Sequence, residues 1–282
     1  MSLRDYLSSK ARRAQFEARR LTNAERAQPD FIVIGAQKSG TSSMFAYLRQ
    51  HDQIIRPIYK EPYFFDRHYH RGLSWYGCNF PTRAAIDRQN ARNQRRHLTF
   101  EATATYIFEP DVPERIARDL RTRKFILLLR NPADRAISAY WHARRMERET
   151  RSLSDALAAD FRRYEQDIAF EEGHGLAPTA PPPRPTYVRR GIYHEAVSRW
   201  QRVFAPKDLL VLQSERMFQE PRDTMAKVFQ FLNLPFADHI DFTPQNVGGY
   251  DEKNAAARKQ LREFYLPHNR KLDAMCDQSF EW

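Results

Sequence analysis

The stretch Phe31-Ile32-Val33-Ile34-Gly35-Ala36-Gln37-Lys38-Ser39-Gly40-Thr41-Ser42-Ser43 decides the fold of this 282-residue chain. Its apolar start predicts a buried strand, and the glycine-rich turn leads into a helix from about Thr41. Gly35 and Gly40 allow the backbone to turn sharply and to approach a ligand closely. Free N–H groups at the helix start favour an anion, and Lys38 adds a positive charge. The stretch predicts a phosphate- or sulfate-binding loop, with a plain glycine-rich turn as the alternative.

Two further apolar runs repeat the order of a strand followed by a helix. Residues 125–129 are continuously apolar and precede a helix that starts after Pro132, and residues 209–212 precede a helix around 225–232. Strands that alternate with helices predict an α/β fold, with a P-loop-like central parallel sheet flanked by helices in a single domain. Residues 171–190 contain five prolines and two glycines, so we interpret them as a surface loop inside this domain.

The N-terminal segment, residues 1–28, is predicted to be a basic helical extension ahead of one domain over residues 29–282. It carries seven Lys or Arg and three Asp or Glu residues. Its apolar residues share one helical face: Leu3, Leu7, Ala11, Ala14, Ala18 and Leu21. This face predicts a surface helix that packs on the domain, and a helix that binds a membrane surface or a partner is the alternative.

The composition favours anionic partners and a cytoplasmic setting. Lys and Arg total 46 against 35 Asp and Glu, which gives a net charge of +11. Nucleotides, nucleic acid, acidic glycans and anionic lipids all fit this charge. Cys78 and Cys276 form no C-x-x-C pair, so neither a disulfide framework nor a zinc site is expected. No apolar run is long enough to span a membrane, and the N-terminus lacks the apolar segment of a signal peptide.

The predicted anion loop differs from the Walker A motif of kinases and other NTPases. Gly35 and Gly40 keep the Walker A spacing, but the lysine lies inside the loop at position 38. The apolar run at 125–129 ends in Arg130, where NTPases often carry an aspartate that helps to bind Mg²⁺. Both differences favour a metal-free donor with two separated anionic groups. A P-loop kinase that uses ATP and Mg²⁺ is the alternative.

A nucleic-acid-binding protein is a third hypothesis, suggested by the net charge. Four arginines lie close together in one stretch: Arg88, Arg92, Arg95 and Arg96. No nucleic-acid fold signature accompanies them, so we interpret the stretch as a solvated basic helix and expect no nucleic-acid partner.

Two segments resemble the donor-binding motifs of the PAPS-dependent sulfotransferase family. Residues 31–43 resemble the family's 5′-phosphosulfate loop, and residues 130–140 resemble its 3′-phosphate motif. The resemblance implies 3′-phosphoadenosine-5′-phosphosulfate (PAPS) as the donor, with Arg130 and Ser138 on its 3′-phosphate. It also implies that the donor is bound by loop residues: Lys38, Ser39, Gly40, Thr41 and Ser42. No metal is expected.

Residues 60–66 resemble the K-E-P-H-F-F-D string of heparan sulfate sulfotransferases and their bacterial relatives, and the likeness extends over about residues 31–282. In that branch the glutamate is the catalytic base, so the resemblance assigns this role to Glu61. Lys38 would neutralise charge that builds on the bridging oxygen of the donor. The alternative for Glu61 is a solvated surface pair with Lys60.

Two positions depart from the pattern of that branch. Tyr63 stands where the family has histidine, and Ala102 stands where it has a lysine that contacts substrate or sulfonate. Both argue against heparan sulfate as the acceptor. The resemblance therefore implies sulfuryl transfer to an acceptor hydroxyl of a glycan, lipid or secondary metabolite, with release of adenosine 3′,5′-bisphosphate.

The remaining expectations concern side chains around the donor. Residues 246–253 stand where the family has a basic C-terminal loop, with Lys253 or Arg258 near the donor. His142 is expected to be packed or solvent-facing rather than catalytic.

Overall fold

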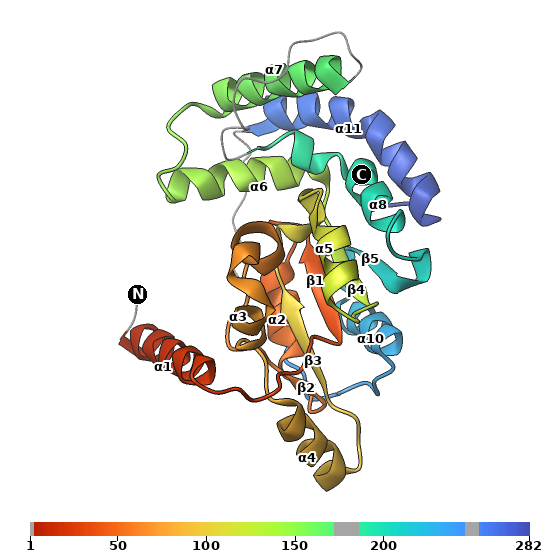
Figure 1. Ribbon diagram of the computed structural model, residues 1–282. Helices are drawn as coiled ribbons and strands as arrows, with labels where there is room; N and C mark the ends of the chain where they lie inside the picture. The colour runs from red at the N-terminus through yellow and green to blue at the C-terminus, as the bar shows by residue number, and fades with distance from the viewer. Residues whose placement is uncertain (1–2, 172–185, 246–253) are drawn as a thin grey trace.

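A five-stranded parallel sheet forms the centre of the chain in the computed structural model, which describes residues 3–171, 186–245 and 254–282 (Figure 1). The strands lie in the order β2-β3-β1-β4-β5. Their bounds are Phe31–Gly35 for β1, Ile54–Ile55 for β2, Leu98–Ala102 for β3, Phe125–Leu129 for β4 and Leu209–Gln213 for β5. All four neighbouring pairs are parallel. The predicted single-domain α/β fold with a parallel central sheet is confirmed.

Helices cover both faces of the sheet. Their bounds are α1 Leu3–Arg20, α2 Thr41–Leu48, α3 Gly72–Gly77, α4 Arg83–Asn93, α5 Val112–Asp119, α6 Pro132–Arg145, α7 Leu153–Glu171, α8 Tyr193–Gln201, α9 Ser214–Gln219, α10 Pro221–Leu232 and α11 Ala255–Cys276. Ile32 and Ile34 of β1 pack in the cluster that includes α5 and α8, whereas Phe31 and Val33 pack against α2 and α10. Burial on both faces explains the continuously apolar runs that the sequence shows.

Strand β3 was not predicted, because its sequence does not look like a buried strand. Leu98, Phe100 and Ala102 alternate with Thr99 and Glu101, which is typical of a strand with one face in water. All five residues are buried. Glu101 is buried because neighbouring side chains donate hydrogen bonds to it, which a single sequence does not reveal.

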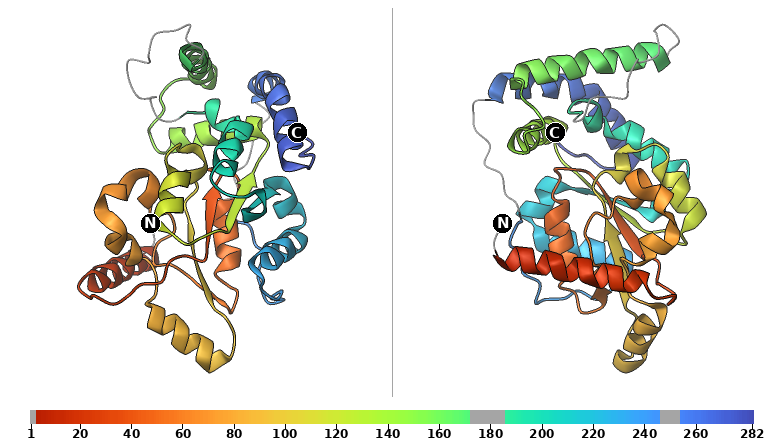
Figure 2. Two further views of the ribbon diagram at one scale, coloured as in Figure 1. Left: turned by 45° about the vertical axis from the view of Figure 1, so that its right-hand side comes forward. Right: turned by 60° about the vertical axis from the view of Figure 1, so that its left-hand side comes forward.

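A layer of helices covers the carboxyl ends of the strands (Figures 1 and 2). Helix α6 follows β4 after two residues and packs against α7, α11 and the segment 187–192 in a separate apolar cluster. Arg135 of α6 is fully buried in this layer and donates to the Tyr187 carbonyl. The layer therefore holds α6 over the edge of the sheet where the predicted anion loop lies.

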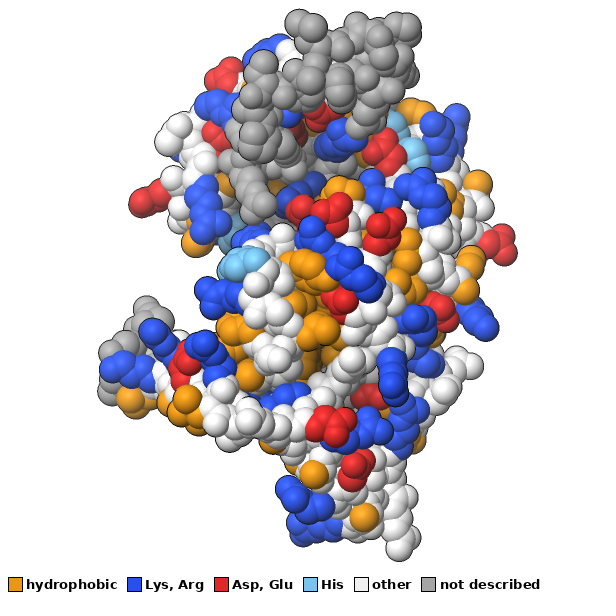
Figure 3. Space-filling model, viewed as in Figure 1, with side chains coloured by type: hydrophobic (Ala, Val, Ile, Leu, Met, Phe, Trp, Pro, Cys, Tyr) orange, Lys and Arg blue, Asp and Glu red, His pale blue; other side chains and the backbone are white. Residues whose placement is uncertain are grey.

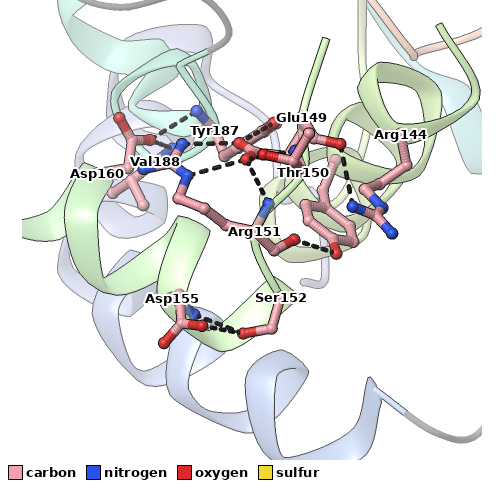
Figure 4. Close-up of polar contacts among 10 residues, drawn as sticks. Arg144, Glu149, Thr150, Arg151, Ser152, Asp155, Asp160, Tyr187 and Val188 are labelled. Carbon is pink, nitrogen blue, oxygen red and sulfur yellow. Dashed lines mark hydrogen bonds and ion pairs between the residues drawn. The ribbon is translucent and has the colours of Figure 1, made fainter. Parts of the chain in front are cut away.

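A polar network fixes the chain where it re-enters this layer (Figure 4). Arg151 Nη2 and the Tyr187 hydroxyl donate to Glu149 Oε2 over 2.7 and 3.0 Å. These hydrogen bonds, that of Arg151 above all, lower the pKa of Glu149 to about 2. Asp160 of α7 accepts from the backbone N–H groups of Tyr187 and Val188. The predicted surface loop at 171–190 lies largely outside the described residues, and this network anchors its final part.

Helix α1 is present as predicted, but its contact with the rest of the chain is different. Leu7 and Leu21 of the predicted apolar face are exposed. Phe16 is buried instead, with its ring centroid 5.5 Å from that of Tyr59 and 5.4 Å from that of Trp75. The contact of Phe16 with the rings of Tyr59 and Trp75 thus determines which face of α1 packs against the domain. The division at residue 28 stays a prediction.

Two further findings bear on the composition. Within the three described ranges, no helix is long and apolar enough to cross a membrane. Cys78 and Cys276 are free thiols. The expected cytoplasmic setting stays a prediction.

Helices α8 and α11 are joined by a pair of histidines. His194 Nε2 and His268 Nδ1 are 3.0 Å apart, and the rings stack. Burial, His194 and Lys271 lower the pKa of His268 to about 4, and burial also lowers the pKa of His194. Because an unfolded histidine binds its proton near pH 6.5, the unfolded chain takes up more protons below that pH.

We therefore expect the free energy of unfolding to fall as the pH drops from about 6.5 towards 4, with uptake of up to about one proton per histidine. Urea unfolding across this range measures the slope. His268→Asn is expected to flatten it. An unchanged slope in His268→Asn would show that the histidine pair does not carry the effect.

Candidate functional site

The candidate site lies where three loops meet at the carboxyl edge of the sheet. β1 is the central strand, with β3 on one side and β4 on the other. The chain reverses its direction across the sheet at β1, since β2 and β3 lie on one side and β4 and β5 on the other. Ligands of open α/β sheets bind at such a switch point. The loops after β1, β3 and β4 are thus brought together.

The loop after β1 has the geometry of an anion-binding turn. Gly40 has φ 88°, a backbone conformation that residues with a Cβ rarely adopt, and a Cβ there would also lie 2.6 Å from the Met217 Cε. Helix α2 begins at Thr41 directly afterwards, and its first N–H groups face the turn. Ser39 is fully buried within the turn. Lys38 has φ 74°, a strained conformation that is frequent at functional sites.

The structure brings Arg130 to this loop. It leaves the end of β4 and donates from Nη1 to the Lys38 carbonyl over 3.3 Å. The Tyr193 hydroxyl donates to the Arg130 carbonyl over 2.9 Å and so fixes the backbone there. Asn131 then caps α6 by accepting from the N–H groups of Ala133 and Asp134. The sequence-predicted pair of loop and strand-end arginine is therefore assembled.

One face of α6 points towards the loop. Ser138, the predicted phosphate residue, is buried on this helix. His142 and Arg145 follow it at spacings of four and seven, which places all three on one face. The pKa of His142 is lowered by burial, Lys38, Arg145 and Arg148, and raised by Glu61. His142, expected to be packed or solvent-facing, is half-buried and lies in electrostatic range of both predicted catalytic residues.

Glu61 lies beside the end of β3. Its backbone N–H donates to the Ala102 carbonyl over 2.9 Å, and its φ of 58° is strained. The Tyr63 hydroxyl donates to Glu61 Oε2 over 2.7 Å, and the Lys60 ammonium lies 3.5 Å from Oε1. The side chains of Lys60 and Glu61 are 23% and 26% exposed. The pair foreseen as the alternative exists, but it is mostly buried and touches the anion loop through Ser42.

A buried network supports the segment that carries Glu61. Glu101, at the end of β3, accepts from the Thr103 hydroxyl over 2.7 Å and from the Tyr76 hydroxyl. The Tyr106 hydroxyl accepts from the N–H groups of Phe64 and Phe65 over 3.1 and 3.2 Å. Burial raises the pKa of Glu101 to about 7, while hydrogen bonds from Tyr76, Tyr106 and Thr103 oppose the shift. Residues 64–65 are thereby held against β3, which limits the freedom of Glu61.

Positive charge accumulates around the loop. Burial lowers the pKa of Lys38, followed by Arg145, Arg130 and Lys60. Figure 3 shows a hollow between the upper helices and α1, with Lys, Arg and His side chains on its rim. Among the described residues, the Lys38 ammonium has no carboxylate in salt-bridge contact. Such a set of cations fits a ligand with several negative charges.

No group of three His, Cys, Asp or Glu residues that could hold a metal ion occurs in the described part of the chain. A cavity of about 750 Å³ lies between residues 20–28 and α3. It is lined by Arg20, Arg71 and Trp75, among others, and none of the predicted site residues lines it.

Three residues near the loop were missed in the sequence, for different reasons. Lys60 was read only as a partner of Glu61. The spacing of four from Ser138 on a predicted helix was a usable signal for His142. Arg190 Nη1 lies 3.3 Å from Gln37 Oε1, although Arg190 belongs to a short helical turn far along the chain. No pattern in the sequence indicated that it would reach the loop.

The predicted replacement of the family's C-terminal basic loop is only partly visible. Residues 246–253, including Lys253, lie outside the described residues. Arg258, on α11, pairs with Asp134 of α6 through Nε over 2.8 Å. It therefore lies at the start of the helix that carries Ser138.

Comparison with known proteins agrees with this geometry. The sulfotransferase domain family matches residues 28–266. Human heparan sulfate glucosamine 3-O-sulfotransferase 6 is 30% identical over 278 residues, which cover 90% of this chain and 73% of that protein. The mouse 3-O-sulfotransferase 3B1 is 28% identical, and the chain spans 65% of its length.

A solved structure shows the same fold. The sulfotransferase from Alicyclobacillus acidocaldarius is 28% identical, with a TM-score of 0.63 over 90% of this chain and 97% of that one. The family match covers the sheet, the anion loop, α6 and most of α11. The chain therefore belongs to the PAPS-dependent sulfotransferase family and is a sulfotransferase.

Proposed function

We propose that this enzyme transfers a sulfuryl group from PAPS to a hydroxyl of a glycan, lipid or secondary metabolite and releases adenosine 3′,5′-bisphosphate. One observation carries the proposal: the carboxylate of Glu61 lies beside the cation-rich anion loop, linked to Ser42 through Lys60. A base next to a donor-binding loop suits the removal of a proton from an attacking hydroxyl. The hydroxyl acceptor is part of the proposal, since relatives named for O-sulfation and for N-sulfation are about equally similar to this chain.

The residues at the switch point fit the two anionic ends of PAPS. Arg130, at the end of β4, and Ser138, on the helix α6 that follows, would hold the 3′-phosphate. The loop residues would hold the 5′-phosphosulfate: Lys38, Ser39, Gly40, Thr41 and Ser42. The N–H groups at the start of α2 would add uncharged donors. The repulsion that Arg145, Arg130 and Lys60 exert on Lys38 would be relieved by this ligand.

Glu61 is positioned to act as the general base. Tyr63 holds Oε2, so Oε1 is the oxygen that would accept the acceptor proton. Burial and the neighbouring Glu61 raise the pKa of Tyr63, so it stays protonated and keeps donating. Lys38 would offset the charge that develops on the bridging oxygen as the sulfur–oxygen bond breaks.

The acceptor is proposed only as a class. Basic side chains on the rim of the hollow allow an anionic acceptor (Figure 3). Heparan sulfate is not carried over from the relatives, because Ala102 and Tyr63 depart from their pattern. The kinase and nucleic-acid alternatives are not favoured. Arg96, from the basic stretch, pairs with Asp30 immediately before β1, at the opposite edge of the sheet.

Replacing Arg130 with alanine is expected to weaken binding of adenosine 3′,5′-bisphosphate about tenfold to a hundredfold. A hydrogen bond to a charged group contributes about 1.5–3 kcal/mol, which corresponds to that range. Calorimetry without acceptor measures the affinity. Arg96→Ala, which removes the same side chain at the far edge, is the matched control. Wild-type affinity in Arg130→Ala would remove this residue from the donor site.

Glu61→Gln keeps the side chain's shape, and its amide oxygen can still accept from Tyr63, but the amide cannot take up a proton. We expect the single-turnover rate to fall by about 10²–10⁴-fold, while affinity for the bisphosphate changes little. Glu263→Gln, on the exposed face of α11, is the control. A rate within about threefold of wild type contradicts the assignment, and His142, His68 and His70 become the candidates.

Turnover is expected to proceed without a divalent metal. The cations that surround Lys38 repel Mg²⁺ and themselves supply the charge that it would bring. The test is activity after extensive treatment with EDTA, compared with activity after Mg²⁺ is added back. Loss with EDTA and recovery with Mg²⁺ would contradict a metal-free transfer.

A further inference from the structure

Lys60 occupies the space between the anion loop and the candidate base. Its ammonium donates to Ser42 Oγ over 3.0 Å and lies 3.5 Å from Glu61 Oε1. It also lies close enough to Lys38 to lower the pKa of that residue. An exposed lysine would move away from a second cation into water. Lys60 is instead mostly buried, with 23% of its side chain exposed.

The backbone determines this position. The Glu61 N–H binds the Ala102 carbonyl, so the chain at residues 60–61 runs beside the end of β3. The strained φ of Glu61 and the buried Pro62 that follows restrict the turn further. At the strand end, position 102 itself offers only a methyl group. The neighbouring segment thus supplies an ammonium at an edge where β3 supplies none.

We propose that Lys60 is a catalytic residue that binds a non-bridging oxygen of the sulfuryl group during its transfer. This inference rests on the proposed function. An ammonium has three N–H donors. Among the described residues its polar contacts are Ser42 and Glu61, which leaves one donor for a ligand oxygen. The contact with Ser42 directs the charge towards the loop that would hold the 5′-phosphosulfate.

The transfer step balances with Lys60 protonated throughout. The acceptor oxygen forms a bond to sulfur, and its proton moves to Glu61 Oε1. The bond between sulfur and the bridging oxygen breaks. Its electron pair stays on the 5′-phosphate, where Lys38 offsets the negative charge. Lys60 neither gains nor loses a proton. It stabilises the negative charge on the sulfuryl oxygens and stays beside the carboxylate that takes up the proton.

A comparison of donor and product affinities tests this role without turnover. Adenosine 3′,5′-bisphosphate lacks the sulfuryl group, so a residue that binds only that group distinguishes the two ligands. In Lys60→Met, which keeps the length but removes the charge, we expect PAPS to bind about tenfold to a hundredfold more weakly. Affinity for the bisphosphate should stay within about twofold. Both are measured by calorimetry without acceptor.

Three variants complete the design. Lys38→Met should weaken both ligands, because Lys38 faces the phosphate that they share. Lys207→Met, an exposed lysine just before β5, should change neither. Lys60→Gln repeats the test with a second neutral side chain if Lys60→Met does not fold.

The outcomes distinguish a failure of the proposed function from a failure of the role proposed for Lys60. If the wild-type protein binds neither ligand, the proposed function fails. If it binds both and the Lys60 variants weaken both equally, or neither, the proposed function stands and the role of Lys60 is overturned. Lys60 would then be an ion-pair partner that positions Glu61. Selective loss of PAPS affinity supports a direct contact with the sulfuryl group.

Discussion

The confinement of like charges at one edge of the sheet is the constraint on which the site depends. Arg145, Arg130 and Lys60 each lie in electrostatic range of Lys38, and their repulsion adds to burial in disfavouring its charged form. The chain holds them with rigid elements: a strained loop, a strand end and a helix that starts at a capped junction. A ligand with several negative charges relieves this repulsion, so binding of the donor stabilises the assembled site.

The rest of the fold supports this edge from two sides. Beneath the loop, Glu101 and Tyr106 form a buried polar network that ties residues 64–65 to β3 and restrains the neighbouring Glu61. Above it, the helical layer of α6, α7 and α11 fixes the face that carries Ser138 and His142. The Glu149 network anchors the chain next to this layer (Figure 4), just before Arg190 reaches Gln37 of the loop.

Two departures from the family pattern have a common structural explanation. Tyr63 replaces a histidine, yet its hydroxyl still contacts the candidate base. Ala102 replaces a lysine, and Lys60 brings an ammonium to the same edge from the adjacent segment. Charge in this site depends on which side chains reach the edge, and more than one backbone position can provide them.

From the sequence alone, the α/β fold and the loop at 35–43 could be predicted, because local patterns encode them: apolar runs, glycine spacing and helices that follow strand ends. The roles of Arg130 and Ser138 follow from the resemblance to the family and stay predictions. Strand β3 and the packing face of α1 could not be predicted, since a buried Glu101 and a slot for Phe16 exist only after distant residues have assembled. The contacts of Lys60 with Ser42 and Glu61 likewise depend on the tertiary structure. A sequence shows which charges are present, but the distances between them come from the packing of segments that are far apart in the chain.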